Sequence, residues 1–146
     1  METTESGSPE APDPTGPRQR LTALREALLH LHKALLESER ISYEAAFGPI
    51  SSPYQFLHLV TSDPWFGWLA PVTQLIAAVD ERLDEEEPLT AKEAEVLIQE
   101  AGSLLVATSE GKGFSRHYDE ALQRSPDVIL AHATAARVIR AKGPAS

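Results

Sequence analysis

The sequence predicts an all-α protein, and two observations carry that prediction. Apolar residues recur three and four positions apart through four long segments, which is the spacing of one helix face. No segment shows the alternation of apolar and polar residues that is typical of a strand, and no internal repeat is present. We therefore expect an antiparallel four-helix bundle with two additional short helices.

The first long helix is expected from Arg18 to the Gly48-Pro49 pair, which stops it. Its leucines form a single stripe that covers only two heptads, so a core-facing role is favoured over a zipper; they are Leu21, Leu24, Leu28, Leu31 and Leu35. A short helix should follow, with Ser52 as its N-cap and Pro53 as its first residue.

The second long helix is expected to begin at Pro64 with Asp63 as its cap and to end before Pro88. A proline inside a helix normally loses a hydrogen bond and pushes its ring against the residue four positions back. Four positions before Pro71 stands Gly67, which has no side chain, so we expect the helix to run through Pro71.

The second half of the chain predicts one more long helix, a short helix and a last long helix. Thr90 and Glu93 form a capping box for the third long helix, which Gly111 and Gly113 should close. The segment FSRHYDEALQR predicts a short helix, and Ser125 caps the fourth long helix, which begins at Pro126.

Length and composition indicate one domain with terminal tails. The chain has 146 residues, and 42% of them are apolar. Residues 1–17 hold four prolines and no large apolar side chain beyond Met1, so we expect a disordered N-terminal tail. The helical-bundle domain should span residues 18–142, and residues 143–146 a C-terminal tail.

The net charge and the absence of cysteine exclude or disfavour several classes of partner and site. The formal charge of −9 argues against nucleic-acid partners, although residues 112–146 alone carry a net charge of +3. With no cysteine, disulfides, thiolate metal sites and cysteine nucleophiles are excluded. The N-terminus resembles no secretory signal, and no apolar run is long enough to span a membrane. We expect a cytoplasmic protein with no membrane partner.

The five histidines are the first candidates for chemistry, because helical bundles house metal centres. The paired Glu-x-x-His segments of ferritin-like sites are absent. A weaker group remains on the predicted helices: His32, Glu39, Tyr43, His58 and His132. A lone histidine on an apolar face usually hydrogen-bonds to a neighbour, so no cofactor is expected, and an interior metal or small-ligand site is the alternative. No catalytic motif is found, and a non-catalytic role is favoured over an enzyme.

Five of the nine aromatic residues lie within fifteen positions, and they suggest an interaction surface. They are Tyr54, Phe56, Trp65, Phe66 and Trp68. Core packing, a partner or self-association surface and a small-molecule pocket are the three interpretations. Phe66 lies about 100° from Trp65 on a helix and is the best candidate for exposure. We expect a self-associating binding module, either a homo-oligomer or one with a protein partner, that uses Trp65, Phe66, Trp68 and Tyr54.

The stretch LHKALLESERISYEAAFGPISSPYQFLHLVTSDPWFGWLAPV covers residues 31–72. It resembles a group of short bacterial helical proteins that carry a DPWFxWL segment between their first and second long helices. The resemblance implies a bacterial cytosolic helical bundle. It transfers no activity and no functional residue to this chain.

Overall fold

A computed structural model describes residues 16–141, and this part of the chain is all-helical, with no strand. Its elements, in chain order, are α1 (Pro17–Phe47), α2 (Pro53–Ser62), the 3-10 helix η2 (Pro64–Leu69), α3 (Ala70–Asp84), α4 (Ala91–Leu104), α5 (Phe114–Arg124) and α6 (Pro126–Arg140). The predicted tails fall outside the described residues except for Gly16, which caps α1, and Pro17, which begins it.

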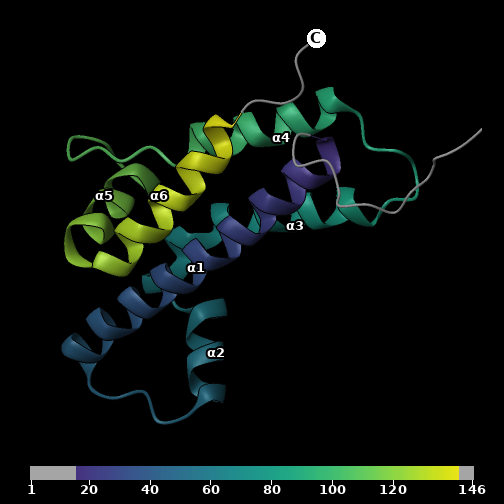
Figure 1. Ribbon diagram of the computed structural model, residues 1–146. Coiled ribbons are helices and arrows are strands. Elements are labelled where there is room, and N and C mark those ends of the chain that lie inside the picture. Colours follow the sequence, from purple (N-terminus) through teal and green to yellow (C-terminus); the bar gives the residue numbers. More distant parts are fainter. Residues whose placement is uncertain (1–15, 142–146) are drawn as a thin grey trace, which may run out of the picture.

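Helix α1 runs through the middle of the molecule, and the other long helices pack against it (Figure 1). It packs against α3, α4 and α6 and also contacts η2 and α5, while α4 contacts both α3 and α6. All five leucines of its predicted stripe are completely buried, which confirms that the stripe faces the core. In contrast, α2 makes its main contacts with η2 and stands below α1 in the view of Figure 1.

The predicted helix starts are confirmed by hydrogen bonds from backbone N–H groups to side-chain oxygens. Ser52 accepts from Gln55, and Asp63 accepts from Trp65. Thr90 and Glu93 form both halves of the capping box. These caps begin their helices because each satisfies an N–H group that has no partner within the helix.

The prediction of one continuous α-helix through Pro71 is wrong. Residues 64–69 form the 3-10 helix η2, and α3 starts at Ala70 with Pro71 in its first turn. Because Pro71 has no N–H, it cannot donate to the carbonyl of Gly67; the N–H of Ala70 does so instead, one residue earlier. The backbone is still helical from Pro64 to Asp84, as the spacing predicted.

The proposed role of Gly67 is also not supported. A Cβ atom built on Gly67 would meet nothing within 4 Å, so this position does not require glycine to make room for the Pro71 ring. Gly67 is not at positive φ either. The missing N–H of Pro71 accounts for the loss of the α-helical hydrogen bond to the Gly67 carbonyl, and Gly67 itself contributes no special conformation.

Helix α4 ends earlier than the sequence predicted, at Leu104 instead of near Gly111. The following residues form a loop in which the N–H of Thr108 donates to the carbonyl of Ser115 over 3.3 Å. Gly113, at φ +64°, is the N-cap of α5 and does not close α4. Glycine suits that position because other residues rarely adopt positive φ.

None of the described helices combines the length and the apolar character that crossing a membrane would require.

Candidate functional site

Phe66 is a core residue, and the prediction that it is exposed is wrong. Its side chain is 2% exposed, and its ring centroid lies 5.7 Å from that of Tyr43 and 5.9 Å from that of Phe56. Tyr43 belongs to α1 and Phe56 to α2. The first turn of η2 is thus held by aromatic rings from two other helices, and Phe66 has no surface to offer a partner.

The two tryptophans of the predicted interaction surface are half-buried and occupied by neighbours. Trp65 packs edge-on against Tyr43 and Phe47, at centroid distances of 5.8 and 5.6 Å. Trp68 stacks on His117 at 5.2 Å, with 18° between the ring planes. The Nε1 atoms of both tryptophans are buried and have no hydrogen-bond partner among residues 16–141. The two indoles therefore belong to the interior more than to the surface.

Tyr54 is the member of the predicted surface that lies open to solvent, with 86% of its area exposed. It shares one side of α2 with Leu57, His58 and Thr61, all of which are exposed. At 100° per residue, these four positions fall within an arc of about 100°. We call this side the outer face of α2.

The outer face of α2 is unusual for a solvent-facing surface. The whole helix, PYQFLHLVTS, contains no Asp, Glu, Lys or Arg, and Leu59 is its one buried residue. Leu57 is 61% exposed. Sequence analysis did not single out Leu57, although the uncharged segment and the spacing of positions 54, 57, 58 and 61 were a usable signal.

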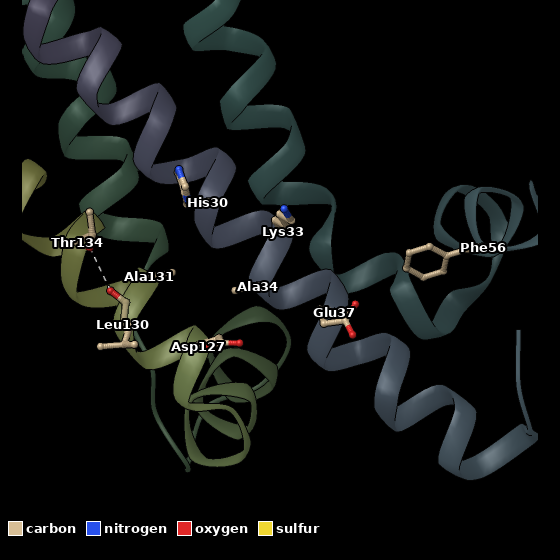
Figure 2. Close-up of a pocket in the computed structure, with 9 residues that line it drawn as sticks. All are labelled: His30, Lys33, Ala34, Glu37, Phe56, Asp127, Leu130, Ala131 and Thr134. Carbon is tan, nitrogen blue, oxygen red and sulfur yellow. Dashed lines mark hydrogen bonds between the residues drawn. The ribbon is translucent and has the colours of Figure 1, made fainter. Parts of the chain in front are cut away.

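A groove of about 750 Å³ lies beside α2 (Figure 2). In this view α1 runs between α6 and the ring of Phe56, which α2 contributes. Four residues of α1 and four of α6 line the groove: His30, Lys33, Ala34 and Glu37, and Asp127, Leu130, Ala131 and Thr134. Leu130 is 66% exposed there, and the Thr134 hydroxyl donates to the Leu130 carbonyl over 3.2 Å.

The groove combines apolar walls with charged edges. Ala34 and Ala131 are small, so α1 and α6 leave space between their side chains at this point. Lys33 and Glu37 contribute opposite charges to its lining, and Glu37 accepts hydrogen bonds from Arg40 that hold the pKa of its carboxyl below the usual range. Leu130 and Phe56 are the two large apolar side chains of the lining.

The structure does not bring together the five residues predicted for a metal or ligand site. Within residues 16–141, no group of three or more His, Asp or Glu side chains is placed to hold a metal ion. Tyr43 lies in the aromatic cluster around Phe66, and His58 lies on the outer face of α2. His32 is half-buried on α1; its Nε2 has no hydrogen-bond partner within the described part of the chain, and burial lowers the pKa of its imidazole.

His132 pairs with a tyrosine and not with another histidine. Its Nδ1 lies 2.6 Å from the hydroxyl of Tyr118, a fully buried residue of α5. Burial raises the pKa of Tyr118, and burial together with the charge of Arg140 lowers the pKa of His132. Both shifts favour a protonated phenol beside a neutral imidazole, which is a satisfied polar pair inside an apolar helix contact.

Glu39 lies in a second pocket, of about 420 Å³, between α1, η2 and α5. The carboxylate of Glu39 is buried and accepts a hydrogen bond from the guanidinium of Arg124. The pocket is further lined by Ser42, Pro64, Trp65, Trp68, His117 and Glu120. Both tryptophans of the chain therefore border one pocket that also contains an internal ion pair.

Comparison of the chain with protein-family models, with curated proteins and with solved structures gave no match.

Proposed function

We propose that the chain is a non-catalytic helical binding module that associates with itself through the outer face of α2. The observation that carries this proposal is that α2 exposes Tyr54 and Leu57 on a helix without a single charged side chain. Isolated exposed apolar residues are common on protein surfaces. Here they share one helix face, and the rest of the chain is strongly acidic.

The proposal includes the antiparallel four-helix bundle as the scaffold of this surface. Its four long helices would be α1, α3, α4 and α6, with α2 and α5 as the additional short ones. Support comes from the contacts of α1 with each of the other three long helices. A bacterial, cytoplasmic setting is part of the same proposal and rests on the resemblance of residues 31–72 and on the lack of cysteine.

Light scattering coupled to gel filtration tests the proposal with a double variant, Tyr54→Ser and Leu57→Ser. Burying one leucine contributes about 1.5–3 kcal/mol, so losing both apolar side chains should raise the dissociation constant at least about tenfold. Val96→Ser is the matched control, since Val96 is an exposed apolar residue on α4. The proposal fails if the double variant and the unchanged chain show the same mass at every concentration.

A second candidate function is the binding of a small organic cation in the pocket beside Glu39. The favouring observation is the composition of its lining: two indole rings and two carboxylates, Glu39 and Glu120, against the one guanidinium of Arg124. Indole faces attract cations with about 0.5–2 kcal/mol each. This candidate replaces the predicted set of five residues, of which only Glu39 lines the pocket.

Tryptophan fluorescence tests the second candidate directly, because both tryptophans of the chain line this pocket. Titration with tetramethylammonium chloride, against sodium chloride at equal ionic strength, should give a saturable change in emission. Glu120→Gln should weaken the response, and Glu100→Gln, an exposed carboxylate on α4, should not. Identical responses to the two salts would remove this candidate.

A further inference from the structure

A third pocket, of about 230 Å³, lies where the C-terminal part of α6 packs against α4 (Figure 1). Two residues around the end of α4 and four on one face of α6 line it: Gly102 and Leu105, and His132, Ala136, Ile139 and Arg140. At about 30 Å³ for one water molecule, it has room for a ligand of about six to eight non-hydrogen atoms. A drug-sized or polymeric ligand is too large for it.

His132 offers this pocket a hydrogen-bond donor whose position is fixed from the other side. Burial raises the pKa of Tyr118, so its phenol keeps its proton and donates it to Nδ1 of His132 over 2.6 Å. A neutral imidazole carries one proton, which must then be on Nε2. Within residues 16–141, Nε2 has no hydrogen-bond partner of its own. Tyr118 therefore acts as a positioning residue that makes Nε2 a donor.

Arg140 adds a positive charge beside this donor. Its charge lowers the pKa of His132, so the guanidinium lies near enough to repel a charged imidazole. The other groups packed here do not offset this charge: Tyr118 of α5 is neutral, and α4 contributes no ionisable residue to the lining. The pocket thus combines one fixed cation and one N–H donor with no carboxylate, which is an arrangement complementary to a monoanion.

The remaining lining selects among anions. Leu105, Ala136 and Ile139 are apolar, so an ion that is polar on all sides, such as phosphate or sulfate, would leave them without a matching surface. The chain also carries −9, which opposes the approach of a multiply charged anion more than that of a single charge. An alkyl chain ending in one carboxylate matches both parts of the pocket.

We propose that this pocket binds a short-chain alkyl carboxylate of about four to six carbons, whose carboxylate accepts hydrogen bonds from the Arg140 guanidinium and from Nε2 of His132. The alkyl chain then lies against the apolar lining residues Leu105, Ala136 and Ile139. This site goes beyond the proposed self-association and does not depend on it, because α2 contributes nothing to the lining.

An NMR titration of the full chain with sodium butyrate tests the site. The imidazole resonances of His132, assigned by their loss in His132→Gln, should shift and saturate. Sodium acetate has the same head group but two fewer methylenes, so it should bind at least about threefold more weakly. Butylammonium chloride has the same alkyl chain with the opposite charge and should give no saturable shift. The proposal is overturned if butyrate and sodium chloride at equal ionic strength shift these resonances alike.

Two arginine variants separate this site from a general effect of charge. Arg140→Gln should weaken butyrate binding at least about tenfold, since it removes a charged hydrogen-bond donor from the pocket. Arg137→Gln is the matched control, because Arg137 is exposed on the same helix and does not line the pocket. Its dissociation constant should stay within about twofold of that of the unchanged chain. Equal weakening by the two variants would contradict the site.

The pH dependence of butyrate binding gives an independent measurement. A bound carboxylate favours the charged imidazole, so binding takes up a proton, and the affinity should rise several-fold as the pH falls from 7.5 to 5.5. Butyrate stays ionised over this range. An affinity that does not change with pH would mean that the carboxylate does not contact His132. A monomeric chain that binds butyrate in this manner would remove the proposed self-association and leave this site standing.

Discussion

The guanidinium of Arg124 donates hydrogen bonds to the buried carboxylate of Glu39 and, over 3.0 Å, to the hydroxyl of Ser38. This contact joins α5 to α1 across 85 residues of sequence. It also closes one side of the pocket that contains both tryptophans. The pair therefore links the stability of the fold to the shape of that pocket.

Removing Arg124 should destabilise the protein, because the Glu39 carboxylate would stay buried without its partner. For Arg124→Ala we expect a loss of about 1–2 kcal/mol in the free energy of unfolding, since the arginine side chain is partly exposed. Arg116→Ala is the control: the pair of Arg116 with Glu120 is exposed on both sides, and its loss should cost under about 0.5 kcal/mol. Urea unfolding measures both, and equal losses would contradict this account of Glu39.

Alanine substitutions at Phe66 and Tyr54 should differ in their effect on the free energy of unfolding, because Phe66 lies in the core and Tyr54 on the proposed association surface. Phe66→Ala should lower the free energy of unfolding by about 3–5 kcal/mol, since it empties a position packed between Tyr43 and Phe56. Tyr54→Ala should leave that free energy within about 0.5 kcal/mol, because the ring is exposed. Thermal and urea unfolding of a dilute sample checks both. A stable Phe66→Ala protein would show that Phe66 is not part of the core.

The hydrogen bond between Tyr118 and His132 should be measurable by removing one oxygen. Tyr118→Phe keeps the buried ring but leaves Nδ1 of His132 without its partner, so we expect a loss of about 1–2 kcal/mol. Tyr54→Phe removes an exposed hydroxyl and serves as the control. The comparison is made by urea unfolding at pH 7.5, and an unchanged Tyr118→Phe variant would count against the pair.

Acid should weaken the fold in two separate steps. Burial holds the pKa of His32 and His132 below 6.5, so the unfolded chain binds more protons than the folded one as the pH falls. The contribution of these two neutral imidazoles to the free energy of unfolding is present above pH 6.5 and is lost as the pH drops below that value. The carboxyl of Glu93, hydrogen-bonded by Arg82, has its pKa lowered to about 2, so its contribution is lost only below about 4.5.

Urea unfolding between pH 7.5 and 5.5 isolates the first of these steps. The free energy of unfolding should fall with pH across this range, and the slope should be smaller in a double variant with His32→Asn and His132→Asn. A double variant with the same slope as the unchanged chain would mean that these imidazoles do not titrate with folding.

Local features of the fold could be predicted because neighbouring residues decide them. Ser52, Asp63 and Thr90 cap helices through hydrogen bonds to N–H groups two or three residues away, and the sequence contains both partners. The leucine stripe of α1 was predictable for the same reason, since helix geometry alone puts those side chains on one face. The effect of Pro71 was local too, because the hydrogen bond that is lost with its missing N–H depends on a carbonyl only four residues away.

The candidate site depended on contacts that sequence spacing does not contain. Phe66 is buried because Tyr43 and Phe56 come from other helices to cover it. His132 was correctly placed on an apolar helix face, but its partner Tyr118 is supplied by α5. The groove exists only because α6 packs beside α1, so neither helix predicts it alone.

The most direct test of the account is sedimentation equilibrium on the unchanged chain over a wide range of concentrations. Self-association through α2 predicts that the average mass rises with concentration from the chain mass of 15.9 kDa toward twice that value. The same measurement on the Tyr54→Ser and Leu57→Ser double variant should show a mass closer to one chain at every concentration. A mass of one chain throughout, for the unchanged protein, would contradict the account.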